Sequence, residues 1–313
     1  MDAQGVRLAW EEVATHVRAE LASVLGSEVV AAANQPGGFS PGVAARCRLA
    51  DGRRYFIKAV SDAQNSVSPN LHRREARVAA ALPAGLPAPQ LVAVVDDGHW
   101  VALVFDDVDG RPPQQPWTFD ELRAAFAAFD EVANQGRGGL AGLVPFADLH
   151  GDGLDGYRRL AGGDPLIERV DPWSRRHVDR LAQLEAEYPA ASAGQALLHS
   201  DLRADNLLIR DEGSVVIVDW PGACLGAGWV DKALMLPSVG LGGGPSPGEV
   251  EERLDPFAGA DPDAVDRVLV ALAGFFTVQG AEPDPPGLPT LRAFQRAQAE
   301  VTRAWLRRRL RLA

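Results

Sequence analysis

The spacing of acidic and amide side chains around two short apolar runs constrains this sequence most. The first apolar run comes directly after the pattern H-x-D-x-x-x-x-N, which contains Asp201 and Asn206. The second apolar run ends at Asp219. An Asp-Glu-Gly turn separates the runs, so we predict a hairpin of Leu207–Ile209 and Val215–Val218 that brings Asn206 and Asp219 to the same end. In phosphoryl transfer from a Mg-nucleotide, one Asp orients the attacking hydroxyl, and an Asn and a second Asp hold the metal. The pattern therefore predicts Asp201 as the catalytic base and Asn206 and Asp219 as Mg²⁺ ligands.

Two other residues of this stretch have supporting roles. We expect His199 to brace the loop and to take no part in proton transfer. Arg203 follows the predicted base by two residues. It is expected either to contact the γ-phosphate of the nucleotide or to form a salt bridge with Asp205, and the sequence leaves both readings open.

Lysine is rare in this chain, and its placement is informative. Of the 31 basic residues only Lys58 and Lys232 are lysines, and Lys58 lies in the apolar run YFIKAV. A buried lysine is costly unless it is paired. Glu75, in a predicted helix, is the one carboxylate between Asp62 and Asp96. We therefore predict a Lys58–Glu75 pair directed at nucleotide phosphates; the alternative is an edge-strand lysine that reaches solvent.

Composition excludes several classes of protein. The chain has 313 residues, 46% of them hydrophobic, which suits one large domain or two lobes. The net charge of -11 argues against nucleic-acid binding. Two distant cysteines argue against a disulfide framework and against a Cys-based zinc site. We identify neither a signal peptide nor an apolar run of about 18 residues, so the expectation is a cytoplasmic protein without a membrane partner.

The order of predicted elements indicates two lobes. Residues 1–105 are expected to form an N-terminal lobe, 106–115 a hinge, and 116–313 a helical lobe. The strands are expected at 28–33, 43–49, 54–60, 91–95 and 100–105, and the helices at 7–25, 70–82, 118–134, 175–188, 230–236, 264–278 and 291–310.

Together these residues resemble the aminoglycoside phosphotransferase family, which has the protein-kinase-like fold, over about residues 28–310. The resemblance implies an α+β fold, with a small antiparallel N-terminal sheet that carries one helix and a larger, mostly helical C-terminal lobe. It also implies ATP and Mg²⁺ as cofactors and a small-molecule hydroxyl as acceptor. The family usually has Gly where this chain has Ser200.

The resemblance assigns roles to other positions as well. Asp106 to Val108 fall where the family's linker offers backbone groups to adenine. Asp231 matches an Asp that braces the metal-binding loop. The loop at 38–42 is not a standard phosphate-binding pattern. Its amides and Ser40 are expected either to cap the β- and γ-phosphates or to form a plain glycine turn.

Two other functions match parts of the sequence. The sequence GFSPG at 38–42 matches the G-x-S-x-G nucleophile elbow of serine hydrolases, but the residues after Ser40 are expected to form a strand where that elbow needs a helix. The second rival is a non-catalytic nucleotide-binding regulator, which is disfavoured because all the key positions are occupied by suitable residues.

The acceptor is the least constrained part of the prediction. Residues 241–290 contain nine acidic residues and two arginines. An aminoglycoside or amino sugar would suit a carboxylate-lined pocket there, and solvated acidic loops are the alternative.

The arginine-rich end of the chain is expected to be a packed helix with a basic outer face. We expect a monomer or a weak homodimer, and the sequence leaves open whether the protein serves antibiotic resistance or metabolism.

Overall fold

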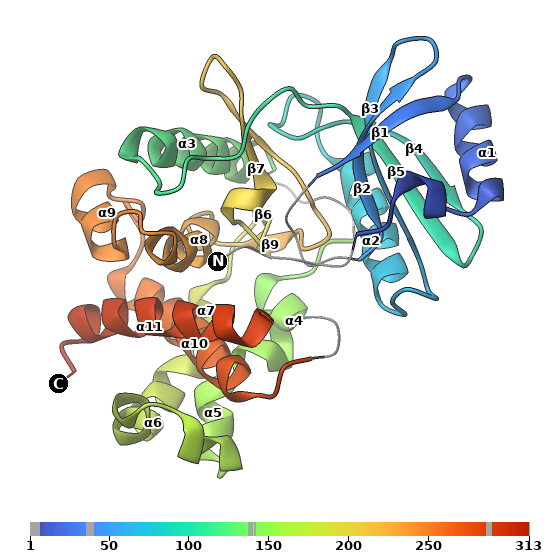
Figure 1. The fold of residues 1–313 in the computed structure, drawn as a ribbon. Coiled ribbons are helices and arrows are strands. Elements are labelled where there is room, and N and C mark those ends of the chain that lie inside the picture. The colour runs from blue at the N-terminus through green and yellow to red at the C-terminus, as the bar shows by residue number, and fades with distance from the viewer. Residues whose placement is uncertain (1–6, 36–40, 137–139, 141, 286–289, 313) are drawn as a thin grey trace.

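The N-terminal part of this computed structural model is a twisted antiparallel sheet with one helix on each face (Figure 1). The structure describes the chain except residues 1–6, 36–40, 137–139, 141, 286–289 and 313. The strand order is β1-β2-β3-β5-β4. The bounds are β1 Val29–Asn34, β2 Val43–Leu49, β3 Arg54–Ser61, β4 Leu91–Asp96 and β5 Trp100–Asp106, with α1 Thr15–Leu25 and α2 Ser68–Ala81.

Alternation along the strands decides which side chains meet each helix. On β5, Ala102 and Val104 are buried in the cluster that includes α1, whereas Leu103 and Phe105 are buried in the cluster on the α2 side. Successive side chains of a strand point to opposite faces. Because Ile57 of β3 belongs to the α1 cluster, its neighbour Lys58 points toward α2. The sheet thus directs the one lysine of its strands toward the helix that carries Glu75.

The C-terminal part is mostly helical and is built around α10. Its helices are α3 Phe119–Gln135, α4 Phe146–His150, α5 Gly156–Ala161, α6 Pro172–Glu185, α7 Tyr188–Ala191, α8 Val230–Leu241, α9 Pro247–Leu254, α10 Pro262–Ala281 and α11 Leu291–Leu310. Two small hairpin-like sheets, β6 Ala196–Leu198 with β9 Cys224–Gly226 and β7 Leu207–Ile209 with β8 Val215–Ile217, face the N-terminal part. Short 3₁₀ turns cover Trp10–Glu12, Gly151–Leu154, Pro165–Arg169 and Ala204–Asn206.

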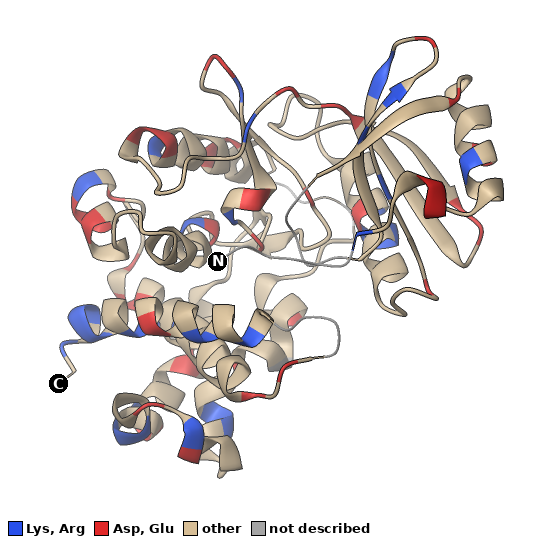
Figure 2. Ribbon diagram, viewed as in Figure 1, with Lys and Arg blue, Asp and Glu red and all other residues tan. Residues whose placement is uncertain are grey.

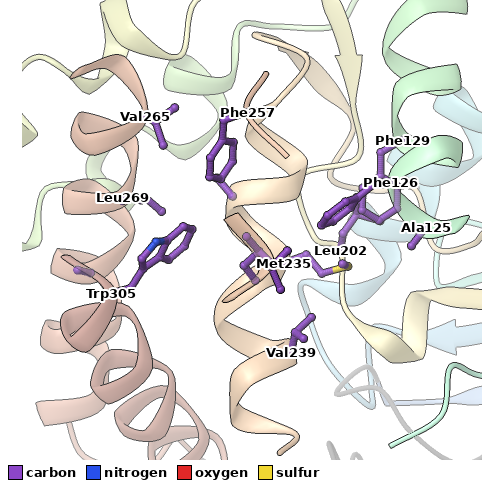
Figure 3. Close-up of a cluster of buried hydrophobic side chains, with 14 of the residues drawn as sticks. Ala125, Phe126, Phe129, Leu202, Met235, Val239, Phe257, Val265, Leu269 and Trp305 are labelled. Atoms are coloured by element: carbon purple, nitrogen blue, oxygen red, sulfur yellow. The ribbon is translucent and has the colours of Figure 1, made fainter. Parts of the chain in front are cut away.

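One core joins α3, α8, α10 and α11 (Figure 3). Phe126 and Phe129 of α3 lie beside Leu202 and Met235, and Phe257 stacks on Trp305 with ring centroids 6.1 Å apart. Leu202 is the residue after Asp201, so the core anchors the predicted catalytic loop directly.

Helix α10 is long and apolar enough to cross a membrane by length and composition, which the sequence analysis did not detect. It is instead the central helix of the core, because most of its residues are buried against α5, α6, α7, α8 and α11. Its apolar character is that of a core helix buried on several sides.

Several helices differ from the sequence-based predictions. The predicted helix at 7–25 begins only at Thr15, after a 3₁₀ turn. Helix α6 begins at Pro172 because Asp171 caps its amides, and it ends at Glu185 rather than at residue 188. Helix α8 continues through Pro237 to Leu241.

The acidic segment 241–290 is mainly helical, as α9 and α10, and three of its nine carboxylates pair with arginines of α11. Arg309 binds Glu251 and Asp266, and Arg308 binds Glu252 at 2.8 Å. Figure 2 shows charges of both signs on α9 and α11. The alternative of solvated loops is therefore wrong for α9, whereas α10 contains the helix predicted at 264–278. Part of the acidic charge stabilises the packing of the terminal helix.

Candidate active site

The loop that carries Asp201 is held rigidly by its neighbours. Asp231, at the start of α8, accepts hydrogen bonds from the backbone N–H groups of His199 and Ser200, both at 2.8 Å. Ser200 has φ 62°, a left-handed conformation that is costly for a residue other than glycine. The family's usual Gly at this position would adopt it without strain. The two bonds to Asp231 hold the backbone in this conformation.

The same loop is tied to the segment around Asp219. Nε2 of His199 lies 3.0 Å from the carbonyl oxygen of Val218, and the Ser200 hydroxyl donates to the carbonyl of Gly222 at 2.6 Å. His199 is fully buried and packs edge-on against Trp220. These contacts agree with a bracing role for His199. Asp231 accepts hydrogen bonds from the two residues just before Asp201. Those residues in turn bond to the segment around Asp219, so Asp231 supports that segment indirectly.

Asp201 combines accessibility with a perturbed pKa. Its side chain is 53% exposed and accepts a hydrogen bond from Arg203 at 3.0 Å. Desolvation by the surrounding protein raises the pKa of Asp201 to about 6, and the positive charge of Arg203 opposes this rise. The carboxylate thus binds a proton more tightly than an ordinary aspartate does, and it is open to a small molecule.

Arg203 forms the salt bridge that the sequence offered as one of two alternatives. Its Nε and Nη2 atoms donate to the two carboxylate oxygens of Asp205 at 3.0 and 3.1 Å. Its Nη1 atom also contacts Asp201. The guanidinium therefore lies at the proposed base and can approach a phosphate there without moving far.

Lys58 contacts two carboxylates from different parts of the chain. Its ammonium lies 2.6 Å from Glu75 Oε2 and 2.5 Å from Asp219 Oδ1. Burial lowers the pKa of Lys58, but the two carboxylates more than offset that effect and raise it. Burial raises the pKa of Glu75, while Lys58 opposes the increase. The predicted Lys58–Glu75 pair is present, and Asp219 completes it.

Asn206 and Asp219 lie at the same end of the β7–β8 hairpin, as the spacing predicted. Leu207 pairs with Ile217, and the N–H of Val218 donates to the carbonyl of Asn206 at 3.0 Å. The amide nitrogen of Asn206 donates to the carbonyl of Asp201 at 2.7 Å. This bond fixes the amide plane and leaves the amide oxygen as the atom suited to a cation. Asp219 has φ 70°, and this conformation directs its carboxylate toward Lys58.

The comparisons with known proteins match this geometry. The model of the phosphotransferase enzyme family (APH) matches residues 38–267. The chain belongs to this phosphotransferase family. No curated protein sequence matches this chain.

Solved structures share the fold of this phosphotransferase. An aminoglycoside phosphotransferase from Alicyclobacillus acidocaldarius subsp. acidocaldarius DSM 446 superposes with a TM-score of 0.57 at 17% identity, covering 92% of this chain and 95% of the other. Choline kinase LicA from Streptococcus pneumoniae gives 0.59 at 13% identity, with 92% and 98% covered. A thermostable mutant of aminoglycoside phosphotransferase APH(4)-Ia, in a ternary complex with AMP-PNP and hygromycin B, gives 0.57 at 15% identity, with 96% and 99% covered.

The segment after β5, where the sequence analysis expected a hinge, contains an ion-pair cluster that the sequence did not reveal. Asp107 is nearly buried and binds Arg46 of β2 at 2.6 Å and Arg54 of β3 at 2.9 Å. Asp106, at the end of β5, is exposed and donates its N–H to the carbonyl of Gln90, and Val108 is half-buried. Asp107 thereby fixes the segment between the two residues expected to face adenine. The signal in the sequence is weak, because an Asp-Asp pair is common in exposed loops.

Ser40 lies outside the described residues, as does most of its loop. Gly42, just after it, has φ 97°, and a Cβ built there would lie 2.3 Å from the carbonyl oxygen of Ala59. Glycine at this position lets the backbone of Gly42 lie close to β3, next to the residue after Lys58. Strand β2 begins at Val43, so a strand follows Ser40, where the nucleophile elbow of a hydrolase requires a helix.

The residues present fit a magnesium ion that is bound together with nucleotide phosphates. Among the described residues, no three His, Cys, Asp or Glu side chains form a cluster that could hold a metal by itself. Asn206 and Asp219 offer one amide oxygen and one carboxylate at adjoining positions. Mg²⁺ is commonly held by one or two carboxylates plus substrate phosphates, so this donor set suits an ion that arrives with a nucleotide.

Proposed function

We propose that this phosphotransferase is a small-molecule kinase that moves the γ-phosphate of ATP to a hydroxyl group of its acceptor. The observation that carries the proposal is the Lys58 ammonium, which lies within 2.6 Å of Glu75 and 2.5 Å of Asp219, next to the loop with Asp201. A cation on one lobe and acidic and amide groups on the other are the parts that phosphoryl transfer requires.

Each residue has one task in the proposed reaction. Asp201 accepts a hydrogen bond from the acceptor hydroxyl and orients it in line with the γ-phosphate. Lys58 binds the nucleotide phosphates, and Glu75 holds Lys58 in place. Arg203, beside Asp201, offers positive charge to the transferred phosphoryl group. Mg²⁺, held by Asn206 and Asp219, would neutralise phosphate charge when bound.

Two observations support ATP as the nucleotide. The related aminoglycoside phosphotransferase APH(4)-Ia mutant was solved with AMP-PNP, an ATP analogue. In this chain, the hinge at Asp106 and Val108 is held by Asp107, and its backbone groups would bind adenine. Ser40 and its neighbouring amides are proposed to cap the terminal phosphates.

The acceptor is proposed to be a small molecule with a hydroxyl group, with an aminoglycoside or amino sugar as the first class to test. The related structures include enzymes named for aminoglycosides and for choline, so the shared fold is compatible with different acceptors. The acidic segment is weaker support for an aminoglycoside acceptor than its net charge suggested, because the carboxylates of Glu251, Glu252 and Asp266 are paired with arginines. We expect the enzyme to act in the cytoplasm, as a monomer or a weak homodimer.

Turnover of Mg²⁺-ATP and Mg²⁺-GTP with a panel of aminoglycosides, amino sugars, macrolides, choline and homoserine tests the proposal. Stimulation of ATP turnover by one acceptor class supports a kinase and names its substrate class. Tight Mg-nucleotide binding without stimulation by any acceptor would favour a regulatory protein. Absence of nucleotide binding would contradict the proposal.

A further inference from the structure

The segment before α1 is fixed against the sheet at Arg7 and Leu8. Arg7 forms a parallel β-bridge with Gly42, and the N–H of Leu8 donates to the carbonyl of Gly42 at 3.1 Å. The side-chain amide of Asn34 donates to the carbonyl of Leu8 at 2.7 Å. Backbone and side-chain bonds therefore hold Arg7 beside the start of β2.

The backbone of Gly42, which is bonded to this segment, lies close to the strand that carries Lys58. Gly42 approaches Ala59 so closely that a Cβ at Gly42 would lie 2.3 Å from the Ala59 carbonyl oxygen. Ala59 is the residue after Lys58, and Lys58 itself pairs with Ala44 of β2. Arg7 is thus held next to the end of the β2–β3 ladder where Lys58 lies.

The charge of Arg7 interacts with groups on three separate elements. Burial lowers the pKa of Arg7, while the carboxylates of Asp219 and Asp205 raise it. On α2, burial and the charges of Lys58 and Arg7 together lower the pKa of His72 to about 3, although the carboxylate of Asp219 opposes this decrease. His72, Asp205 and Asp219 come from α2, the 3₁₀ turn Ala204–Asn206 and the loop after β8. A cation that acts on all three lies within electrostatic range of α2, of the turn before β7 and of Asp219.

We propose that Arg7 binds the terminal phosphates of the nucleoside triphosphate, as a second cation beside Lys58. This inference rests on the proposed function. A guanidinium presents a planar fork of donors that matches phosphate oxygens. In the structure its charge interacts with those of Asp219 and Asp205, at the place where the metal–phosphate end of the nucleotide is proposed to bind. The segment before α1, far in sequence from the catalytic loop, thereby supplies a substrate contact.

The test is a comparison of ATP with adenosine, which lacks the phosphates. We would measure the Kd of both by calorimetry, with Mg²⁺ present, for the wild type and for Arg7→Gln. We expect ATP to bind about tenfold or more weakly to the variant, the size of a lost charge-assisted hydrogen bond, and adenosine to bind equally to both proteins. Arg48→Gln removes the same charge from an exposed position on β2 and is expected to change neither Kd.

The outcomes separate the two proposals. If the wild type binds ATP and Arg7→Gln binds it equally well or more tightly, the role of Arg7 is overturned and the kinase proposal stands. If the wild type does not bind ATP, both fail. Arg7→Lys keeps the positive charge but lacks the planar guanidinium. It replaces Arg7→Gln in the experiment if thermal unfolding shows that Arg7→Gln does not fold. It is expected to weaken the binding of ATP but not of adenosine. Equal weakening of ATP and adenosine in either variant would indicate a structural role and overturn the inference.

Discussion

The Lys58 ammonium and the Asp219 carboxylate lie 2.5 Å apart although 161 positions separate them in the sequence. Lys58 belongs to the N-terminal sheet, and Asp219 follows the β7–β8 hairpin of the C-terminal part. Glu75 contacts the same ammonium. The pair therefore joins the two parts of the molecule at the point where the nucleotide phosphates are proposed to bind.

Replacing Lys58 by Met should reduce the kcat of phosphoryl transfer by about 100-fold or more, the usual cost of losing one preorganised charged contact. Lys232→Met is the matched control, because Lys232 is also buried and bound to a carboxylate, Asp130, at 2.6 Å. Steady-state kinetics should show a large loss in the first variant and little change in the second. Equal losses would contradict a specific role for Lys58.

Asp231→Asn should lower kcat more than it weakens nucleotide binding. The variant keeps one acceptor oxygen for two backbone N–H groups, so the loop at His199 and Ser200 loses a bond and Asp201 loses its fixed position. Nucleotide affinity measured by calorimetry should stay close to that of the wild type. Parallel losses of nucleotide affinity and kcat would show that Asp231 supports the whole fold rather than the position of Asp201.

Glu185 should make stability depend on pH. Its buried carboxylate accepts the N–H groups of Tyr157 and Arg158, and burial raises its pKa from 4.5 to about 7. A raised pKa means that the folded state binds the proton more tightly, so this contribution to stability is complete below pH 4.5 and is lost as pH rises through 7. Urea unfolding at pH 5.5 and pH 8 should show that the wild type loses stability relative to Glu185→Gln at the higher pH. A difference that stays constant with pH would refute this role.

Arg309→Ala should destabilise the protein by about 2 kcal/mol or more, because Glu251 and Asp266 would lose their partner in a mostly buried site. Arg308→Ala is the control. Arg308 and its partner Glu252 are both more than half exposed, so its loss should cost less than about 1 kcal/mol. Urea unfolding of the two variants measures both values, and equal costs would show that burial does not decide the strength of these pairs.

Regular alternation and helical spacing located several elements at their observed bounds. Strand β2 covers Val43–Leu49 and α11 covers Leu291–Leu310, as expected from the sequence. Helix α9 was missed because its region is rich in Pro and Gly, although Ser246 and Glu249 form a capping box with Pro247 between them. That capping signal is local and was available in the sequence.

The site was predictable where one short segment or one rare residue carried it. The spacing of Asp201, Asn206 and Asp219 fixed their common location, and the scarcity of lysine indicated Lys58. The contacts of Asp107 and Arg7 depend on segments that meet only in the folded chain. A lone arginine or an Asp-Asp pair has no periodicity or spacing that reveals its partner, so these two residues emerged only from the structure.

The most direct test of the account is phosphate transfer from γ-labelled ATP to the stimulating acceptor, measured for the wild type and for Asp201→Asn. Calorimetry on the same preparations gives the ATP affinity of each protein. The account predicts that the wild type labels the acceptor, that Asp201→Asn loses this activity by about 100-fold or more, and that both proteins bind ATP with similar affinity. Labelling of the acceptor by Asp201→Asn at the wild-type rate would contradict it.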